Sequence, residues 1–146
     1  MLAPGFRSLG SSSELDQGSN VITATHNRQG QAVAYVADLE GALSLTIEAE
    51  LDYGSGGGTL KVYVQTSLDQ GATWMDIANL AFAQADAKKV INVSALTPKT
   101  TPATPGDATL ADNTCIDGVL GDRVRVKAVA SAAYVDSQLS VGMIVR

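Results

Sequence analysis

The sequence predicts an all-β protein, namely an antiparallel β-sandwich of jelly-roll or Greek-key type with about eight strands and an extended N-terminal arm. Two observations predict this class. Short runs of alternating apolar and polar residues recur along the chain, and turn-forming Gly, Asn and Asp residues separate them. A 3.6-residue apolar period is absent apart from a short stretch at 81–89. A closed small barrel is the alternative fold.

The chain has 146 residues, the length of one domain. Residues 7–20 are rich in Ser and Gly and hold too few apolar groups to become ordered alone. We therefore divide the chain into a flexible or extended arm, residues 1–20, and one sandwich domain, residues 21–146. Single apolar side chains along the arm are candidate contacts with a neighbouring protein: Leu2, Phe6, Leu9 and Leu15.

The first expected strands are 21–25 and 31–37, joined as a hairpin by "HNRQG". Residues 42–51 give the clearest strand, because every second side chain is apolar and the others are polar. The apolar set, expected to face the core, is Leu43, Leu45, Ile47, Ala49 and Leu51.

Residues 59–67 and 74–82 form a second expected hairpin, and 88–94 follow as a strand. Residues 95–118 then make a long connection, whose three prolines remove backbone donors and favour an extended path: Pro98, Pro102 and Pro105. Loops of this length are uncommon inside compact domains, so we expect the loop and its prolines at a subunit contact. Two last strands are expected within 122–131 and 134–146.

The turn of the second hairpin carries a motif with the spacing S-x-D-x-G-x-x-W, formed by Ser67, Asp69, Gly71 and Trp74. It resembles the Asp-box turn of sialidase-like propeller blades. The Asp69 carboxylate is expected to accept backbone N–H groups one or two residues on, and Gly71 to adopt positive φ. The motif occurs once and the chain is too short for a propeller, so we interpret it as a structural turn.

Composition excludes several function classes. A net charge of −5 with ten basic residues argues against nucleic acid and against anionic membranes as partners. Cys115 is the single cysteine, so no intrachain disulfide can form, and the N-terminal sequence lacks the pattern of a secretion signal. No run of 18 apolar residues exists, which favours a soluble protein.

No set of residues predicts catalysis, a metal or a cofactor, and the protein is expected not to be an enzyme. Glu48 and Glu50 could flank a glycosidic bond, but no aromatic-lined cleft is evident beside them. Four aspartates recur every five residues around the long loop, a spacing that does not match a calcium loop: Asp107, Asp112, Asp117 and Asp122.

A cationic stripe made by Arg123, Arg125 and Lys127 has two interpretations. It could dock on an acidic protein surface, or it could be an ordinary solvated strand face that pairs with Glu48 or Glu50 across the ladder.

Two segments together carry a family resemblance: "LKVYVQTSLDQGATWMDIA" (60–78) and "DGVLGDRVRVKAVASAAYVDSQLSVGMIVR" (117–146). They resemble small virion structural proteins of tailed bacteriophages, in particular capsid decoration (cement) proteins with a jelly-roll body. The resemblance implies an outer-capsid location in the virion, the major capsid protein as partner, and a homo-oligomer, with a trimer favoured over a dimer. A carbohydrate-binding or receptor-binding module of the phage tail is the alternative.

Overall fold

A computed structural model describes residues 4–13, 15–22, 25–26, 32–33, 35–37 and 39–146. The described residues contain no helix and form strands throughout, which confirms the predicted all-β class. The strands are β1 (Gly5–Ser12), β2 (Gly18–Val21), β3 (Thr25–His26), β4 (Ala32–Val33), β5 (Ser44–Asp52), β6 (Ser55–Gly56), β7 (Leu60–Ser67), β8 (Met75–Phe82), β9 (Ala87–Ser94), β10 (Thr114–Cys115), β11 (Arg123–Ala130), β12 (Tyr134–Val135) and β13 (Gln138–Val145).

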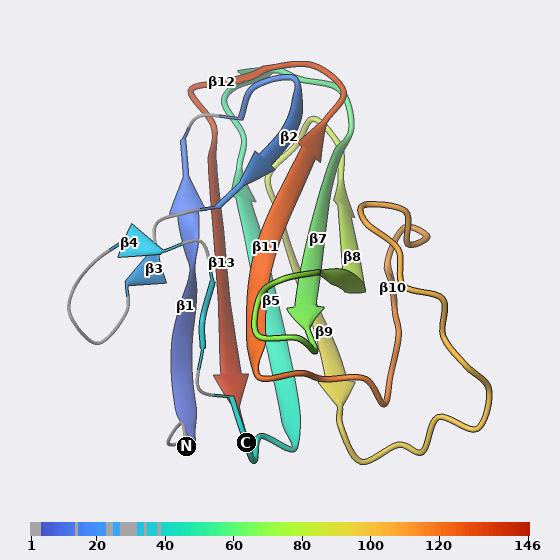
Figure 1. Ribbon diagram of the computed structural model, residues 1–146. Helices are drawn as coiled ribbons and strands as arrows, with labels where there is room; N and C mark the ends of the chain where they lie inside the picture. The colour runs from blue at the N-terminus through green and yellow to red at the C-terminus, as the bar shows by residue number, and fades with distance from the viewer. Residues whose placement is uncertain (1–3, 14, 23–24, 27–31, 34, 38) are drawn as a thin grey trace.

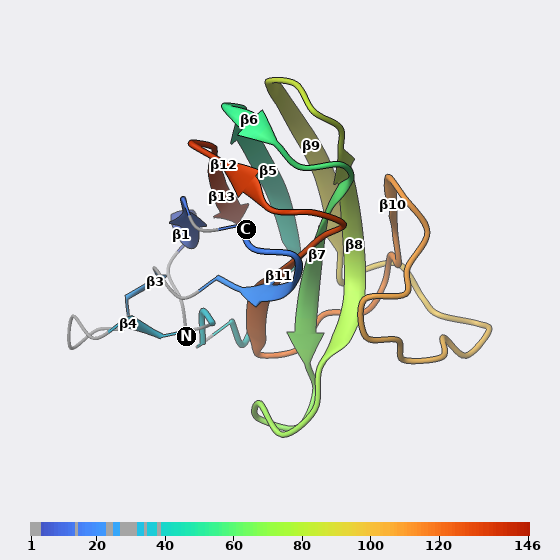
Figure 2. The same ribbon diagram turned by 90° about the horizontal axis from the view of Figure 1, so that it is seen from above.

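Two antiparallel sheets face each other as a sandwich (Figures 1 and 2). One has the strand order β1-β13-β5-β9 and the other β10-β8-β7-β11-β2. Four two-residue strands, β3, β4, β6 and β12, belong to neither sheet. Without these and the two-residue β10, eight strands remain. Their order in the two sheets is the double Greek-key connectivity of a jelly roll. The sandwich and its approximate strand number are therefore confirmed.

The core lies between the sheets and is made by the inward-facing half of each strand. In β5, the side chains of Leu45, Ile47, Ala49 and Leu51 are at most 1% exposed, whereas Glu48 and Glu50 point outward. Strand β13 alternates in the same way and pairs with β5 over its whole length. Each fully buried Leu, Ile or Val side chain contributes roughly 1.5–3 kcal/mol, so these alternating strands supply most of the stability. Leu43 was expected on this face but lies before β5 and is half exposed.

The prediction that residues 1–20 form an arm separate from the sandwich is wrong, because parts of this segment belong to both sheets. Residues 5–12 form β1, which pairs with β13 from Gly5↔Val145 to Ser12↔Leu139, and residues 18–21 form β2 on β11. Leu9 and Leu15 are 2% and 1% exposed within the protein's own core, so they are not available to a neighbour. The division at residue 20 fails because backbone pairing with β13 orders a segment whose composition alone would not.

The first expected hairpin lies partly outside the described residues. Val21 belongs to β2, and among the residues described there two pairs, Thr25↔Val33 and His26↔Ala32, join β3 to β4. Val36 makes an isolated β-bridge to Val124, the second residue of β11. The expected count of eight principal strands is right, but β1 replaces the expected strand at 31–37.

The long loop between β9 and β11 packs on its own domain. β10 lies beside β8 at the edge of the five-stranded sheet (Figure 1). Residues 106–110 are hydrogen-bonded to Asp76 on β8 and Gln65 on β7. The loop thus partly covers the outer side of the five-stranded sheet, where Gln65, Asp76 and Asn79 are buried. In the part of the chain that the structure describes, no helix is long and apolar enough to cross a membrane.

Candidate protein-docking face

The outer side of the four-stranded sheet carries an open hollow. We call this side the outer face, and it consists of three rows of residues that lie side by side across the four strands. The rows are Phe6–Ile144–Thr46–Asn92, Ser8–Gly142–Glu48–Val90 and Ser11–Ser140–Glu50–Lys88. The rows are two residues apart along β13, β5 and β9, because side chains of a strand alternate between its two sides, and on β1 the register shift between Ser8 and Gly10 adds one residue.

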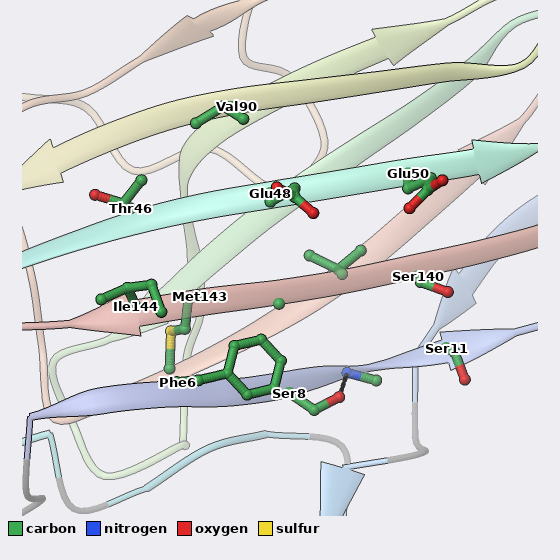
Figure 3. A pocket seen from close by; sticks show the side chains of 13 residues that line it. Phe6, Ser8, Ser11, Thr46, Glu48, Glu50, Val90, Ser140, Met143 and Ile144 are labelled. Atoms are coloured by element: carbon green, nitrogen blue, oxygen red, sulfur yellow. Dashed lines mark hydrogen bonds between the residues drawn. The ribbon is translucent and has the colours of Figure 1, made fainter.

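An open hollow of about 510 Å³ lies over this face (Figure 3). Its centre is Gly142, which has no side chain in the middle row. The Phe6 ring reaches over this position, and a Cβ at residue 142 would lie 2.7 Å from Phe6 Cε2. Phe6 is nevertheless 64% exposed and Val90 60% exposed, so apolar surface faces solvent on both sides of the glycine. The glycine therefore lets the Phe6 ring lie against β13, and the hollow borders this ring.

The other end of the face is acidic. Lys88 Nζ lies 3.3 Å from Glu48 Oε1 and 3.7 Å from Glu50 Oε2, and these two carboxylates raise the pKa of the Lys88 ammonium. A second, smaller hollow continues past Glu50 and is lined by Asp52 and Asp86. Among the described residues, four carboxylates and one ammonium group therefore lie at this end, and two of the carboxylates contact the ammonium group. The three side chains of the ion pair are each about half exposed, so their attraction is screened by water and holds the face together only weakly.

The side chains of the outer face can bind other molecules. Within the described residues, no cluster of three or more His, Cys, Asp or Glu side chains could hold a metal ion. The outer face presents an exposed ring, small hydroxyl side chains and half-exposed carboxylates on a shallow surface. Such a surface can contact apolar groups and cations of a partner.

The motif turn between β7 and β8 is held by its own side chains. Ser67 Oγ accepts the Gly71 N–H at 2.7 Å and donates to Asp69 Oδ1 at 2.9 Å. Asp69 accepts the Thr73 N–H at 2.8 Å and the Thr73 hydroxyl, which lowers the pKa of its carboxyl. Its backbone partner is therefore four residues on, not one or two as expected. Gly71 has φ of +92°, a conformation that favours glycine.

Trp74 joins this turn to the cationic stripe. Arg125 lies over the Trp74 ring at 4.5 Å, and Arg123 lies over the Tyr35 ring at 5.2 Å. The two rings contact each other at 5.9 Å between their centres. Trp74 is partly exposed, so this stack covers the surface of the sheet rather than its core.

The stripe does not pair with Glu48 or Glu50, which lie on the other sheet. Lys127 Nζ instead contacts Asp107 Oδ1 at 2.8 Å, and Arg125 Nε donates to Gln65 Oε1 at 2.9 Å. Lys127 and Gln65 both lower the pKa of the Asp107 carboxyl. The solvated-face interpretation was therefore wrong about the partners. Lys127 fastens the long loop to the sheet, whereas Arg123 and Arg125 contact side chains at and near the motif turn.

The remaining candidate residues are distributed over the surface. Pro98, Pro102 and Pro105 are exposed on the long loop, away from the outer face. Leu2 lies outside the described residues. The aspartates spaced by five do not converge. Each has its own partner instead: Lys127 for Asp107, Lys61 for Asp112, Thr97 for Asp117 and Arg123 for Asp122.

Sequence reasoning found Phe6 but missed the central residues of the outer face, Gly142, Val90 and Ile144. One signal was present, since a glycine inside an alternating strand often marks a close approach of another group. The neighbours of Gly142 could not be read from the sequence, because they depend on pairing between strands far apart in the chain.

In comparisons with known proteins, no family model, no curated protein and no solved structure matches the chain.

Proposed function

We propose that this protein is a structural protein of a tailed-bacteriophage virion, specifically a decoration protein that binds the outer capsid surface and bridges neighbouring capsid subunits. The sequence resemblance described above suggests this class. The major capsid protein is the partner in this proposal, and a trimer of the chain is the predicted oligomer.

The outer face is the observation that supports the proposal most. Its hollow is open and shallow, it exposes Phe6 and Val90, and half-exposed carboxylates border it. Exposed apolar groups with a charged rim are typical of surfaces that bind other proteins. A rigid sheet presents these groups without reordering, which lowers the entropy cost of association.

The proposed mechanism is mechanical. A protein that contacts two neighbouring subunits binds the assembled shell and not the free subunit, so binding stabilises the shell by linkage. Many weak contacts on a repetitive surface act together, because each bound copy holds the others near their sites. No chemical step is involved.

Pelleting with undecorated capsids tests the proposal. The wild-type protein is expected to sediment with capsids and to saturate at a fixed number of copies per shell, and heated capsids should release their DNA later when decorated. A quantitative protein gel of purified virions should show hundreds of copies. If the protein is absent from virions, or occurs in a handful of copies at the tail, the decoration proposal is wrong.

A carbohydrate-binding module of the virion is the second candidate. The exposed Phe6 ring near the hydroxyls of Ser8 and Ser140 and the carboxylates of Glu48 and Glu50 has the stacking and hydrogen-bonding groups that bind a sugar. A glycan array with wild-type protein and Phe6→Ser distinguishes the candidates. Binding to one glycan class that Phe6→Ser abolishes would favour the sugar-binding function over decoration.

A further inference from the structure

We infer that the outer face binds an extended polypeptide segment that places an aliphatic side chain in the hollow, against Val90 and the Phe6 ring that covers Gly142, and lysine or arginine side chains against Glu50 and the acidic end. This inference rests on the proposed function, since the segment would belong to the capsid protein. It specifies the chemistry of the partner, which the proposed function leaves open.

The apolar half of the face accepts one aliphatic side chain. Gly142 has no side chain between Ser8 on β1 and Glu48 on β5, and the Phe6 ring lies over it, with Val90 bordering the same hollow. An aliphatic group inserted there would cover the exposed Phe6 ring and Val90 side chain. Apolar surface removed from water contributes about 25 cal/mol per Å², and this contribution needs no charge on the partner.

The acidic half selects a cation. Glu48, Glu50, Asp52 and Asp86 carry four negative charges, and Lys88 is the one ammonium group that the structure places among the described side chains there. Asp86 Oδ1 already accepts the Tyr53 N–H, but the carboxylates of Glu50 and Asp52 are open to solvent. A lysine or arginine of a partner would therefore be attracted, whereas an acidic segment would be repelled.

Strand geometry sets the spacing of the segment. Gly142, Ser140 and Gln138 follow each other at two-residue intervals on β13, and they stand beside Glu48, Glu50 and Asp52. Two residues of an extended chain span about 6.6–6.8 Å, so the aliphatic and the first acidic position are that far apart. A segment lying along β13 would match them with an apolar residue at one position and basic residues two and four positions away.

A second copy of this chain fits the face poorly. Self-association through it would bring two sets of surplus carboxylates together, which costs free energy. Four of the described cations are moreover engaged elsewhere in the fold: Lys61 with Asp112, Lys127 with Asp107, and Arg123 and Arg125 with aromatic rings. A partner with its own basic residues meets no such cost.

Two variants of the full chain test the inference in the capsid-pelleting assay. Gly142→Thr fills the hollow with a residue that strands accept, and it displaces only the flexible, exposed Phe6 ring. Glu50→Lys reverses the charge at the acidic end. Glu40→Lys is the matched control. Glu40 is also exposed, but it lies near the opposite sheet, because the N–H of the preceding residue, Leu39, donates to the carbonyl of Asp122 just before β11. Circular dichroism and melting temperature verify that all variants fold.

We expect Gly142→Thr and Glu50→Lys each to weaken capsid binding about tenfold or more, and Glu40→Lys to leave it unchanged. Raising the salt from about 0.05 M to about 0.5 M should weaken wild-type binding and should affect Glu50→Lys less. If the wild type binds and both variants bind equally well, the inference is wrong and the decoration function stands. If the wild type does not bind capsids, both the inference about the outer face and the proposed decoration function are wrong. Self-association of the free protein that Gly142→Thr abolishes, measured by sedimentation, would assign the face to a second copy and overturn the inference.

Discussion

The Asp76 carboxylate on β8 accepts the backbone N–H of Thr109 at 2.8 Å, joining the edge of the five-stranded sheet to the long loop 33 residues further along the chain. The same carboxylate accepts the N–H groups of Ala108 at 3.0 Å and Leu110 at 3.1 Å. Asp76 is 1% exposed, so these bonds are shielded from water. One buried side chain thereby fixes a segment that its sequence alone leaves unstructured.

Asp76→Ala should release the loop and leave the sandwich folded. The change removes the acceptor of three backbone amides and of the Gln65 side-chain amide, and the loss of bonds to a buried charged group costs about 1–3 kcal/mol. Hydrogen exchange should accelerate at residues 108–110 and stay slow in β5 and β13. Asp16→Ala, in the exposed turn between β1 and β2, is the control and should change neither quantity. Unchanged protection at 108–110 would show that other contacts hold the loop.

Leu9→Ala should destabilise the protein far more than Phe6→Ala, although both residues lie on β1. Leu9 is 2% exposed and its truncation leaves a cavity, which costs about 2–5 kcal/mol, whereas Phe6 is 64% exposed. Urea unfolding of the two variants measures the difference. Equal midpoints would mean that β1 does not contribute to the core in solution.

Removal of residues 1–12 should likewise destabilise the sandwich, because it deletes β1 and leaves one edge of β13 unpaired. The truncated protein should melt at a lower temperature and aggregate more readily than the full chain. A truncated protein with an unchanged melting temperature would restore the interpretation of this segment as a separate arm.

Trp74→Ala should reduce stability by less than the ~3–5 kcal/mol that loss of a fully buried aromatic costs, because Trp74 is partly exposed. The variant loses the contacts of the ring with Arg125 and Tyr35. Trp74→Phe retains an aromatic face and should recover part of the stability. Thermal unfolding of the three proteins by circular dichroism tests this order, and a Trp74→Phe protein no more stable than Trp74→Ala would contradict it.

Stability should fall below about pH 4, and part of this loss should come from Asp107. Its carboxyl has a pKa lowered from the ordinary value of 3.8 by hydrogen bonds from Lys127 and Gln65. A pKa that is lower in the folded than in the unfolded state adds stability above the unfolded value. That stability is lost as the pH falls through the folded value. Asp107→Asn should therefore be less stable than wild type at neutral pH, and the difference should shrink in acid. Melting temperatures between about pH 7 and pH 2 measure it, and a constant difference would contradict the assignment.

The alternation of side chains was sufficient to predict the class of fold and most of its long strands. The predicted runs at 42–51, 59–67, 74–82, 88–94 and 122–131 correspond to β5, β7, β8, β9 and β11 within two residues at each end. This worked because each strand buries one side, so its apolar period of two is visible locally. Strand β1 has a Ser- and Gly-rich sequence with a register shift between Ser8 and Gly10, and it showed no such period.

The sequence by itself therefore determined that this chain is an antiparallel sandwich with a proline-containing connection and a side-chain-capped turn at 67–74. Only the tertiary structure decided that residues 5–12 complete a sheet, that Asp76 holds the long loop, and that Phe6, Gly142 and Val90 share one hollow. The physical reason is the range of the interactions. Alternation and turn chemistry act over a few neighbouring residues, whereas strand register brings together positions more than a hundred residues apart, and no local pattern encodes which strands will meet.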